Sequence, residues 1–278
     1  MKLRAPGPKP IKLAPIRPNL GVQAAYRKRL LNLIESMHKD IIQTLTSVYQ
    51  AHPRLATDES SAAAASRAMK GLSRTWQKRF QDGSQDLAAH FADEALKHSD
   101  MALRTTLQKA GFSVKFQMTR PMNDAYRAVI SENVGLIRSI PAQHLADVQG
   151  LVMRSVQHGR TLGDLSEQLQ DRFGVTKRRA ALISRDQNNK ATAVMNRIRK
   201  LGLGIDKSQW VHTSASKDPR DSHEAMNGEI YDTADGCFDG DEGDFIQPGE
   251  LINCGCVSLG VIPGLDDDPE EEEAGHEE

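Results

Sequence analysis

Apolar residues recur every three or four positions through the first part of the chain, which is the spacing of one face of an α-helix. Residues 22–50 are therefore predicted to form one helix, which Pro53 ends. Its apolar stripe consists of Leu30, Ile34, Met37, Ile41, Leu45 and Val48. Residues 61–110 are predicted to form a second long helical region, ended by Gly111. Its stripe consists of Met69, Leu72, Trp76, Phe80, Leu87, Phe91, Leu103 and Leu107.

The pattern changes between residues 111 and 141. Val114, Phe116 and Met118 alternate with polar residues, which predicts a short strand or an extended linker. Pro141 is then placed in the first turn of a new helix, because that turn leaves its N–H groups unbonded and proline has none. This helix carries Leu145, Val148, Val152 and Val156, and Gly159 is expected to close it.

Two threonines are predicted to begin the next two helices. A threonine hydroxyl can accept a hydrogen bond from a free N–H of a first helical turn. Thr161 is expected to cap a short helix ending at Gly174, and Thr176 a longer helix ending at Gly202. The middle of the chain is therefore predicted to be a helical bundle.

After Gly204 the chain consists of short apolar pieces between turns rich in Gly, Asp and Asn, which is typical of a small module with short strands. The fold class is predicted to be α+β, with a mostly helical N-terminal and central region followed by a small α+β C-terminal module. The predicted order is an extended basic arm (1–21), a long-helix region (22–121), a helical bundle (122–204), the module (205–263) and a disordered acidic tail (264–278).

Composition restricts the class of protein. Hydrophobic residues make up 38% and charged residues 26% of the 278 residues, and the mean hydropathy is −0.52. No apolar run approaches the length of a membrane span, and the N-terminus lacks the apolar stretch of a signal peptide, so no membrane role is expected. The sequence contains no P-loop, no nucleophile elbow and no paired carboxylate motif, which argues against ATPases and common hydrolases.

Charge is distributed unevenly along the chain. Residues 1–34 contain eight Lys or Arg and no carboxylate, together with five prolines, at positions 6, 8, 10, 15 and 18. This composition predicts an extended cationic arm, which can bind nucleic-acid phosphates or an acidic protein surface. The segment that begins at Asp266 is acidic and is expected to stay disordered, since its charges repel one another.

The three cysteines and a nearby histidine suggest a metal site. Cys254 and Cys256 are two residues apart, so in an extended strand both thiols point to the same side. With His223 they supply three ligands for tetrahedral Zn²⁺, and either Cys237 or His212 supplies the fourth. The alternative is that the cysteines are small buried side chains without metal.

The same region carries an ordered set of motifs. In chain order the set comprises Trp210, Asp218-Pro219-Arg220-Asp221-Ser222-His223, Asn227-Gly228, Pro248-Gly249 and Asn253-Cys254-Gly255-Cys256. This set resembles the phage Mu F-like head morphogenesis family. The resemblance extends upstream through Arg185 and Asn189 and covers roughly residues 122–262. The dipeptide Asp186-Gln187 departs from the family, which often has Thr-Glu there.

The resemblance implies a minor head protein of a tailed bacteriophage and not an enzyme. Such a protein binds the portal vertex and supports head morphogenesis and genome packaging or delivery. Its expected partners are the portal protein, the major capsid or scaffolding protein, and DNA contacted non-specifically by the arm. It is expected in the virion after assembly in the host cytoplasm. The alternative is a metal-dependent nuclease that acts on phage DNA through His223, Asp218 and Arg220.

Several motif residues are expected to be structural. Asp218 is predicted to be a helix N-cap with Pro219 in the first turn. Arg220 is predicted to pair with a carboxylate, because its planar fork suits one. Arg185, Asn189 and Arg197 are spaced to share one helix face, where they are expected to form a polar seam. The acidic stretch 235–244 is interpreted as a solvated loop, since it lacks the glutamate spacing of a calcium loop.

Overall fold

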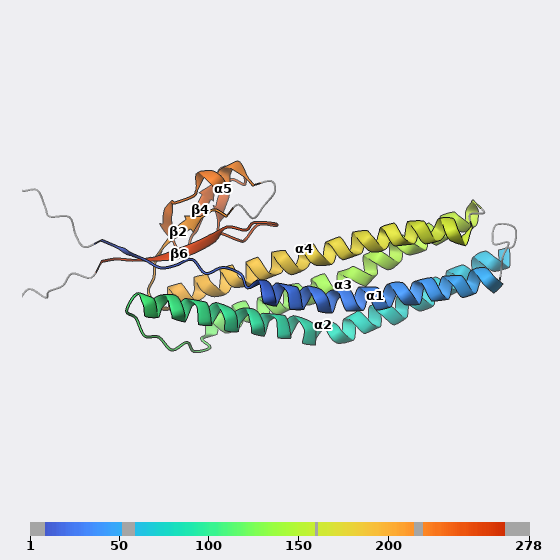
Figure 1. Ribbon diagram of the computed structural model, residues 1–278, viewed down its shortest axis with the longest axis horizontal. Coiled ribbons are helices and arrows are strands. Elements are labelled where there is room, and N and C mark those ends of the chain that lie inside the picture. The colour runs from blue at the N-terminus through green and yellow to red at the C-terminus, as the bar shows by residue number, and fades with distance from the viewer. Residues whose placement is uncertain (1–8, 52–58, 159–160, 214–218, 265–278) are drawn as a thin grey trace, which may run out of the picture. The chain divides into compact units, whose positions relative to one another are not determined.

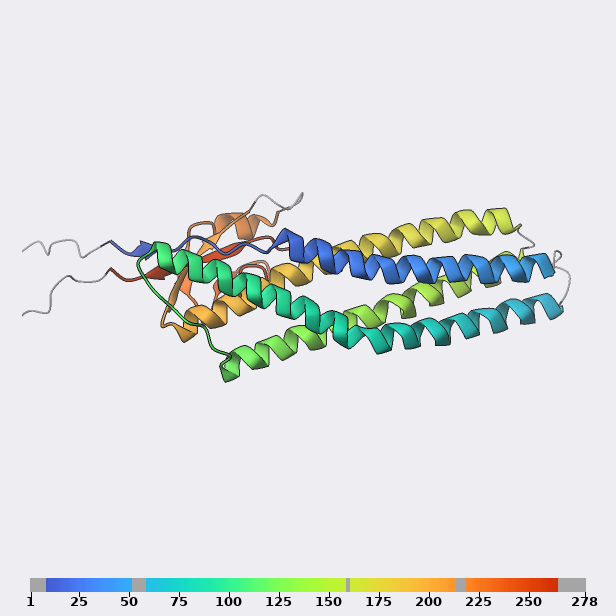
Figure 2. The same ribbon diagram turned by 60° about the horizontal axis from the view of Figure 1, so that its bottom comes forward.

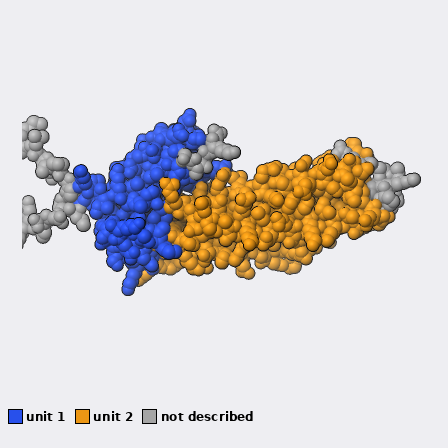
Figure 3. Space-filling model, in the orientation of Figure 1, with its two compact units in different colours: residues 1–16, 101–116, 196–278 blue, residues 17–100, 117–195 orange. Residues whose placement is uncertain are grey.

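The computed structural model describes residues 9–51, 59–158, 161–213 and 219–264. These residues form two compact units, coloured separately in Figure 3. The helical unit comprises residues 17–100 and 117–195, within the described ranges, and the sheet unit the described residues of 1–16, 101–116 and 196–278. The predicted fold class is confirmed, because long helices are followed by a small C-terminal module of short antiparallel strands.

Four long helices build the helical unit: α1 (Leu20–Ala51), α2 (Glu59–Lys109), α3 (Arg120–Gln157) and α4 (Leu162–Gly202). They lie side by side in Figures 1 and 2, and consecutive helices run in opposite directions. The predicted apolar stripes form the core, because Leu30, Ile34, Met37, Ile41 and Leu45 are fully buried on α1. The predictions for residues 22–50 and 61–110 are thus confirmed to within two residues at each end.

The prediction for Pro141 is wrong. Helix α3 runs through this residue, and it begins at Arg120 with Pro121 in its first turn. The cap is Thr119, whose Oγ1 accepts a hydrogen bond from the N–H of Met122 at 3.4 Å. The buried side chains before and after Pro141 keep the helix continuous although proline removes one of its hydrogen bonds.

The predicted break at Gly174 is also wrong. Thr161 begins α4 as predicted: its hydroxyl accepts from the N–H of Asp164 at 3.2 Å, and the Asp164 carboxylate accepts from the N–H of Thr161 at 3.0 Å. The helix then continues through Gly174.

Thr176 does not cap a helix. Its hydroxyl donates to the carbonyl of Arg172 at 3.1 Å and lies 2.8 Å from His144 Nδ1. Packing on buried side chains outweighs the weak helix preference of glycine. The predicted end at Gly159 lies outside the described residues.

Residues 112–119 form an extended linker without a strand, which is one of the two predicted alternatives. Gly111 ends α2 in the left-handed region, with φ of 90°. The N–H of Phe112 bonds back to the carbonyl of Leu107 at 2.9 Å, as in the C-terminal motif that closes many helices.

The sheet unit contains two antiparallel sheets. Strands β1 (Ile11–Lys12), β2 (Lys207–Val211), β3 (Ile230–Asp232) and β6 (Val257–Ile262) form the larger sheet in the order β1-β6-β2-β3. Strands β4 (Cys237–Asp239) and β5 (Asp244–Ile246) form a hairpin, and α5 (Asp221–Ala225) is a short helix. Ser208 pairs with Gly260 and Trp210 with Ser258, so β2 is the central strand between β6 and β3.

The described part of the basic arm, from residue 9, is extended as predicted, but it belongs to the sheet unit. Ile11 pairs with Ile262, and Leu13 donates its N–H to the carbonyl of Gly260 at 2.9 Å. Leu13 and Ile16 are buried in a small core with Leu103, Leu107 and Ile205. These contacts give the arm a role in the fold that its proline and charge content did not indicate. The acidic segment from Asp266 onward lies outside the described residues.

The units therefore do not follow the predicted domain boundaries. The last part of α2 and the last turns of α4 belong to the sheet unit, together with the arm. The physical reason is that Leu103 and Leu107 are buried against Leu13 and Ile16, so the end of a long helix completes a core that the strands alone cannot close. In the described ranges, no helix is long and apolar enough to cross a membrane.

Candidate metal centre

Three short segments of the sheet unit carry the predicted metal ligands. His212 follows the last residue of β2, His223 lies in α5, and Cys254 and Cys256 stand in the turn that leads into β6. His223, Cys254 and Cys256 are buried. The sheet pairing of β2 with β6 brings the first and last of these segments together, because Val211 pairs with Val257.

The turn before β6 depends on two residues with positive φ. Gly249 has φ of 86° and Asn253 has φ of 62°. Asparagine tolerates this left-handed conformation better than most side chains. The N–H of Cys254 then bonds to the carbonyl of Leu251 at 3.0 Å. Asn253 and Gly249 therefore have a backbone role in these motifs: they reverse the chain so that both cysteines turn inward.

The side chains of His223, Cys254 and Cys256 meet at one point. Their ligand atoms all lie within 4.8 Å of one another. His223 Nδ1 is 3.4 Å from Cys254 Sγ and 3.8 Å from Cys256 Sγ. His212 Nδ1 approaches the same cluster at 3.6 Å from Cys256 Sγ. Two imidazole nitrogens and two sulfurs are thus gathered in a largely buried place.

Carboxylates face the other nitrogen of each ring. His223 Nε2 is 3.3 Å from Asp239 Oδ2, and the Asp239 side chain is fully buried. His212 Nε2 is 3.8 Å from Glu224 Oε1, which is half exposed. Burial acts to raise the pKa of Asp239, but the hydrogen bond from the N–H of Asp241, at 2.9 Å, helps to hold that pKa below its ordinary value. Asp239 is therefore a buried carboxylate that faces the His223 ring.

The two thiols differ in acidity. The hydrogen bond from the Cys256 thiol lowers the pKa of Cys254 below its ordinary value, and the N–H of Gly249, 3.3 Å from Cys254 Sγ, acts in the same direction. The same shared hydrogen bond raises the pKa of Cys256, and burial adds to this effect. The pair therefore holds one negative charge readily, which is the form of sulfur that binds metals.

Cys237, the third cysteine, lies apart from this group. It is buried in β4, and burial raises the pKa of its thiol to about 11. It belongs to the apolar core of the module, which also contains Trp210, Met226, Tyr231, Cys254, Cys256 and Ile246. The Trp210 ring meets the His223 ring edge to face, with centroids 5.2 Å apart. Trp210 thus forms one wall of the cluster.

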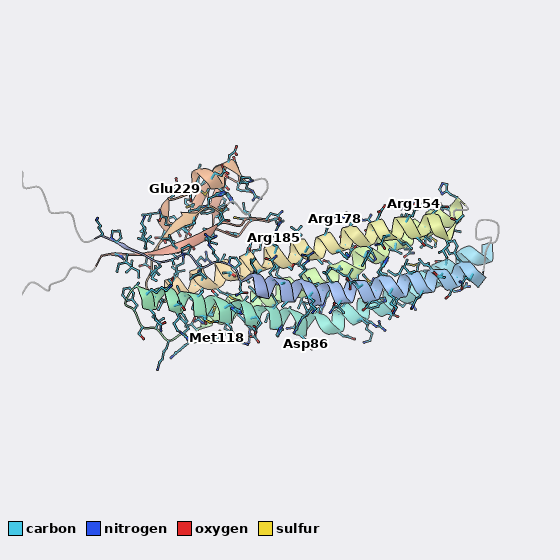
Figure 4. All side chains as sticks on the ribbon, viewed as in Figure 1. Asp86, Met118, Arg154, Arg178, Arg185 and Glu229 are labelled. Atoms are coloured by element: carbon cyan, nitrogen blue, oxygen red, sulfur yellow. The ribbon has the colours of Figure 1, made fainter. Side chains whose placement is uncertain are left out.

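The remaining motif residues have structural positions. Gly228 has φ of 92°, and its N–H bonds to the carbonyl of Trp210 at 2.9 Å, which continues the pairing beside β2. Pro248 is buried next to Gly249. Arg185 and Asn189 lie on α4, as predicted, and Arg185 is exposed (Figure 4). Arg197 donates to the carbonyl of Ala234 at 3.2 Å.

The predicted start of α5 is wrong. The helix begins at Asp221 with Arg220 as its N-cap, so Pro219 is not in its first turn. Asp218 lies outside the described residues. Among the described residues, the Arg220 guanidinium donates to the carbonyl of Ile252 at 3.4 Å instead of to a carboxylate. A planar fork fits a carbonyl oxygen as well, and here it ties α5 to the turn that carries the cysteines.

Asp239 is the residue that sequence reasoning missed. The stretch 235–244 was interpreted as a solvated loop, yet it contains β4, in which Cys237 and Asp239 are buried and Phe238 is exposed. The signal was the alternation of these three residues, which is the pattern of a half-buried strand. The surrounding glycines and acidic residues obscured it.

The fold defines a helical-bundle protein with a small module of short strands. The module contains a cluster of cysteine and histidine side chains. Comparison with known proteins confirms the resemblance found in the sequence: residues 146–259 match the family described as Phage Mu protein F like protein. This match extends from α3 through α4 and the segments from β2 to β5 into β6. The family that this part of the chain resembles is one of phage head proteins.

A relative supports the comparison over a longer range. The chain is 28% identical over 259 residues to an uncharacterized protein of Haemophilus influenzae. The alignment covers 90% of this chain and 56% of that protein, so the chain spans little more than half the length of its relative. No solved structure matches the chain.

Proposed function

We propose that the protein is a minor head protein of a tailed bacteriophage that binds the portal vertex and supports head morphogenesis and genome packaging or delivery. The observation that carries this proposal is the family match over residues 146–259, which includes the whole cysteine and histidine cluster. In this proposal the protein is located in the virion, at the portal vertex, after assembly in the host cytoplasm. The portal protein is its main partner, and capsid or scaffolding protein a further one.

The exposed aromatic pair of the β4–β5 hairpin supports a protein partner. Phe238 and Phe245 are 57% and 58% exposed, although phenylalanine is usually buried. Their rings meet edge to face with centroids 5.5 Å apart, so they form one continuous apolar patch. Adjacent aromatic side chains of this kind are enriched where protein surfaces bind one another. We therefore place part of the portal contact on this hairpin.

Co-expression with the cognate portal protein tests the proposal. The two proteins are expected to elute together in size-exclusion chromatography, and Phe238→Ser with Phe245→Ser is expected to weaken the complex. Met118→Ser is the matched control, because Met118 is 54% exposed outside the sheet unit. If the portal protein elutes alone, portal binding is contradicted. If the double variant binds as well as the unchanged chain, the hairpin is not the contact.

The nuclease alternative has less support from the site. Both ring nitrogens of His223 face other side chains, and the residue is 3% exposed, so it has no open side toward a phosphate. Incubation with plasmid DNA and Mg²⁺ or Mn²⁺ is expected to leave the plasmid intact. Cleavage that His223→Ala abolishes would establish the nuclease instead.

A further inference from the structure

We propose that His212, His223, Cys254 and Cys256 bind one Zn²⁺ ion in a closed, structural site, with Asp239 as the residue that positions His223. This inference goes beyond the proposed head function, since the site closes the fold of the sheet unit. Four protein ligands without an open position are characteristic of structural zinc, whereas catalytic zinc keeps a position for water or substrate.

The distances between the ligand atoms fit a tetrahedron around zinc. With Zn–S near 2.3 Å and Zn–N near 2.05 Å, a nitrogen and a sulfur of one tetrahedral site lie about 3.6 Å apart. The observed separations between Nδ1 and Sγ atoms are 3.4, 3.6 and 3.8 Å. These three separations therefore match those that an ion requires. His223, Cys254 and Cys256 form the compact group, and His212, which reaches it through Cys256 Sγ, would complete the site.

Of the two candidates for the fourth ligand, the geometry points to His212. Its Nδ1 faces Cys256 Sγ, and its side chain is 17% exposed, which leaves a path for the ion to enter. Neither His212 nor Cys237 belongs to the compact group of ligand atoms within 4.8 Å of one another, and it is the contact with Cys256 Sγ that favours His212. The raised pKa of Cys237, caused by burial, agrees with a protonated thiol in the core.

The surroundings of the ligands are those of metal-bound histidines and thiolates. A histidine that binds a metal through one nitrogen usually donates its other N–H to a carboxylate or carbonyl. Here the second nitrogens of His223 and His212 face Asp239 and Glu224, at 3.3 and 3.8 Å. The N–H of Gly249 points at Cys254 Sγ, where it stabilises a thiolate. Without metal, the buried His223 Nδ1 has only weakly hydrogen-bonding sulfur partners.

The ion would join the short helix α5 to the ends of two strands that pair with each other. His212 follows β2, His223 lies in a five-residue helix, and the cysteines precede β6. A helix this short does not hold its conformation by its own hydrogen bonds. One ion bonded to all three segments would fix α5 over the sheet and fix the side-chain arrangement around Trp210.

Metal analysis of the full chain, purified without a histidine tag, tests the proposal. Elemental analysis is expected to find about one zinc per chain, as a closed four-ligand site requires. Cys254→Ser and Cys256→Ser are expected to lose most of this zinc. Cys237→Ser is the matched control, since it removes a buried cysteine of the same module outside the cluster, and it is expected to keep the metal.

Cobalt substitution identifies the fourth ligand. Co²⁺ added to the chelator-treated protein is expected to give the visible bands of tetrahedral cobalt and a thiolate charge-transfer band. His212→Ala is expected to change the visible bands while the thiolate band persists. Cys237→Ser is expected to leave both unchanged. If Cys237→Ser changes the thiolate band and His212→Ala does not alter the visible bands, the assignment of His212 is wrong.

The role of Asp239 is tested by metal affinity. Asp239→Asn keeps the size of the side chain but removes the carboxylate that faces His223, and loss of such a partner lowers metal affinity by about 10–100-fold. Competition with a zinc chelator measures this change, and the cobalt spectrum is expected to remain tetrahedral. A purely structural aspartate would leave the affinity of the folded protein unchanged.

Two results would overturn the proposal. The first is folded, chelator-free protein that contains no zinc and takes up neither Zn²⁺ nor Co²⁺ when either is added. The second is zinc that stays bound in Cys254→Ser and Cys256→Ser. If the cysteine variants do not fold, chelation of the unchanged chain decides, because removal of the metal is expected to lower its melting temperature. Portal binding can succeed or fail independently of these measurements.

Discussion

Lys200 places an amine inside the sheet unit, where its side chain is 2% exposed. Nζ donates to the hydroxyls of Ser208 and Ser258, at 2.7 Å each, and Ser208 lies 2.8 Å from the hydroxyl of Thr233. Burial lowers the pKa of Lys200 to about 7, because neutral hydroxyls do not replace the solvation of a charge. The amine is thus held by hydrogen bonds but without a charged partner among the residues that bond to it.

This environment predicts a stability that depends on pH. The pKa of Lys200 in the folded chain lies below that in the unfolded chain. Between about pH 7 and pH 10 the amine is therefore protonated in the unfolded state and largely neutral in the folded state. The free energy of unfolding should therefore rise from pH 7 to pH 9, by at most about 1.4 kcal/mol per pH unit. Lys200→Met should remove that rise, as measured by urea unfolding of both proteins. Parallel pH profiles would contradict the low pKa.

A second prediction at this scale concerns Gly236. Its φ is 98°, and a Cβ atom there would overlap the carbonyl of Ile246 on the facing strand. Gly236→Ala should destabilise the β4–β5 hairpin by at least about 1–2 kcal/mol, from the backbone conformation alone. Gly240→Ala is the control, since a Cβ at Gly240 meets nothing within 4 Å. Equal melting temperatures for the two variants would show that the hairpin adjusts easily.

At the scale of the element, α4 continues through a residue that favours helix ends. Gly174 lies within the helix, where glycine costs about 1 kcal/mol relative to alanine. A Cβ there would meet only the end of the flexible Arg178 side chain, at 3.5 Å. Gly174→Ala should therefore stabilise the protein by about 0.5–1 kcal/mol.

Thermal unfolding followed by circular dichroism checks this prediction. Gly174→Pro supplies the opposite change, because proline removes a helix hydrogen bond and should cost about 3 kcal/mol or more. If Gly174→Ala destabilises the chain, glycine is required at this position for a reason other than helix propensity.

The basic arm is the second element whose position carries a prediction. Leu13 is 3% exposed in the small core of the sheet unit, while the neighbouring Lys12 is exposed. Leu13→Ala should cost about 2–5 kcal/mol, as is usual for leucine removed from a core. Lys12→Ala should change stability little. Chemical denaturation compares the two, and an equally stable Leu13→Ala variant would mean that the arm does not stay on β6.

For the whole molecule, the important feature is that the sheet unit is discontinuous in sequence. Its small core combines Leu13 and Ile16 from the arm with Leu103 and Leu107 from the end of α2. A fragment of residues 196–264 should therefore fail to fold alone, since it retains Ile205 without these partners. The nuclear magnetic resonance spectrum of this fragment should lack the dispersion of a folded sheet. A well-dispersed spectrum would show that the C-terminal strands suffice.

The local patterns of the sequence were enough to predict much of this protein. Apolar spacing predicted α1 and α2, because helix periodicity depends on neighbouring residues alone. The change of composition after Gly204 predicted the module, and the motifs from Trp210 to Cys256 indicated the family that comparison confirmed for residues 146–259. The ligand types of the cluster were also visible, because Cys254, Cys256 and His223 are suited to the same metal.

Tertiary structure decided what depends on contacts between distant residues. Pro141 and Gly174 do not interrupt their helices, because buried side chains on both sides outweigh a local preference of a few kcal/mol at most. Sequence left His212 and Cys237 equivalent as fourth ligands, and only the approach of His212 Nδ1 to Cys256 Sγ, at 3.6 Å, favours His212. Asp239 became visible as the partner of His223 only when β4 was placed beside α5, since burial of a carboxylate depends on what surrounds it.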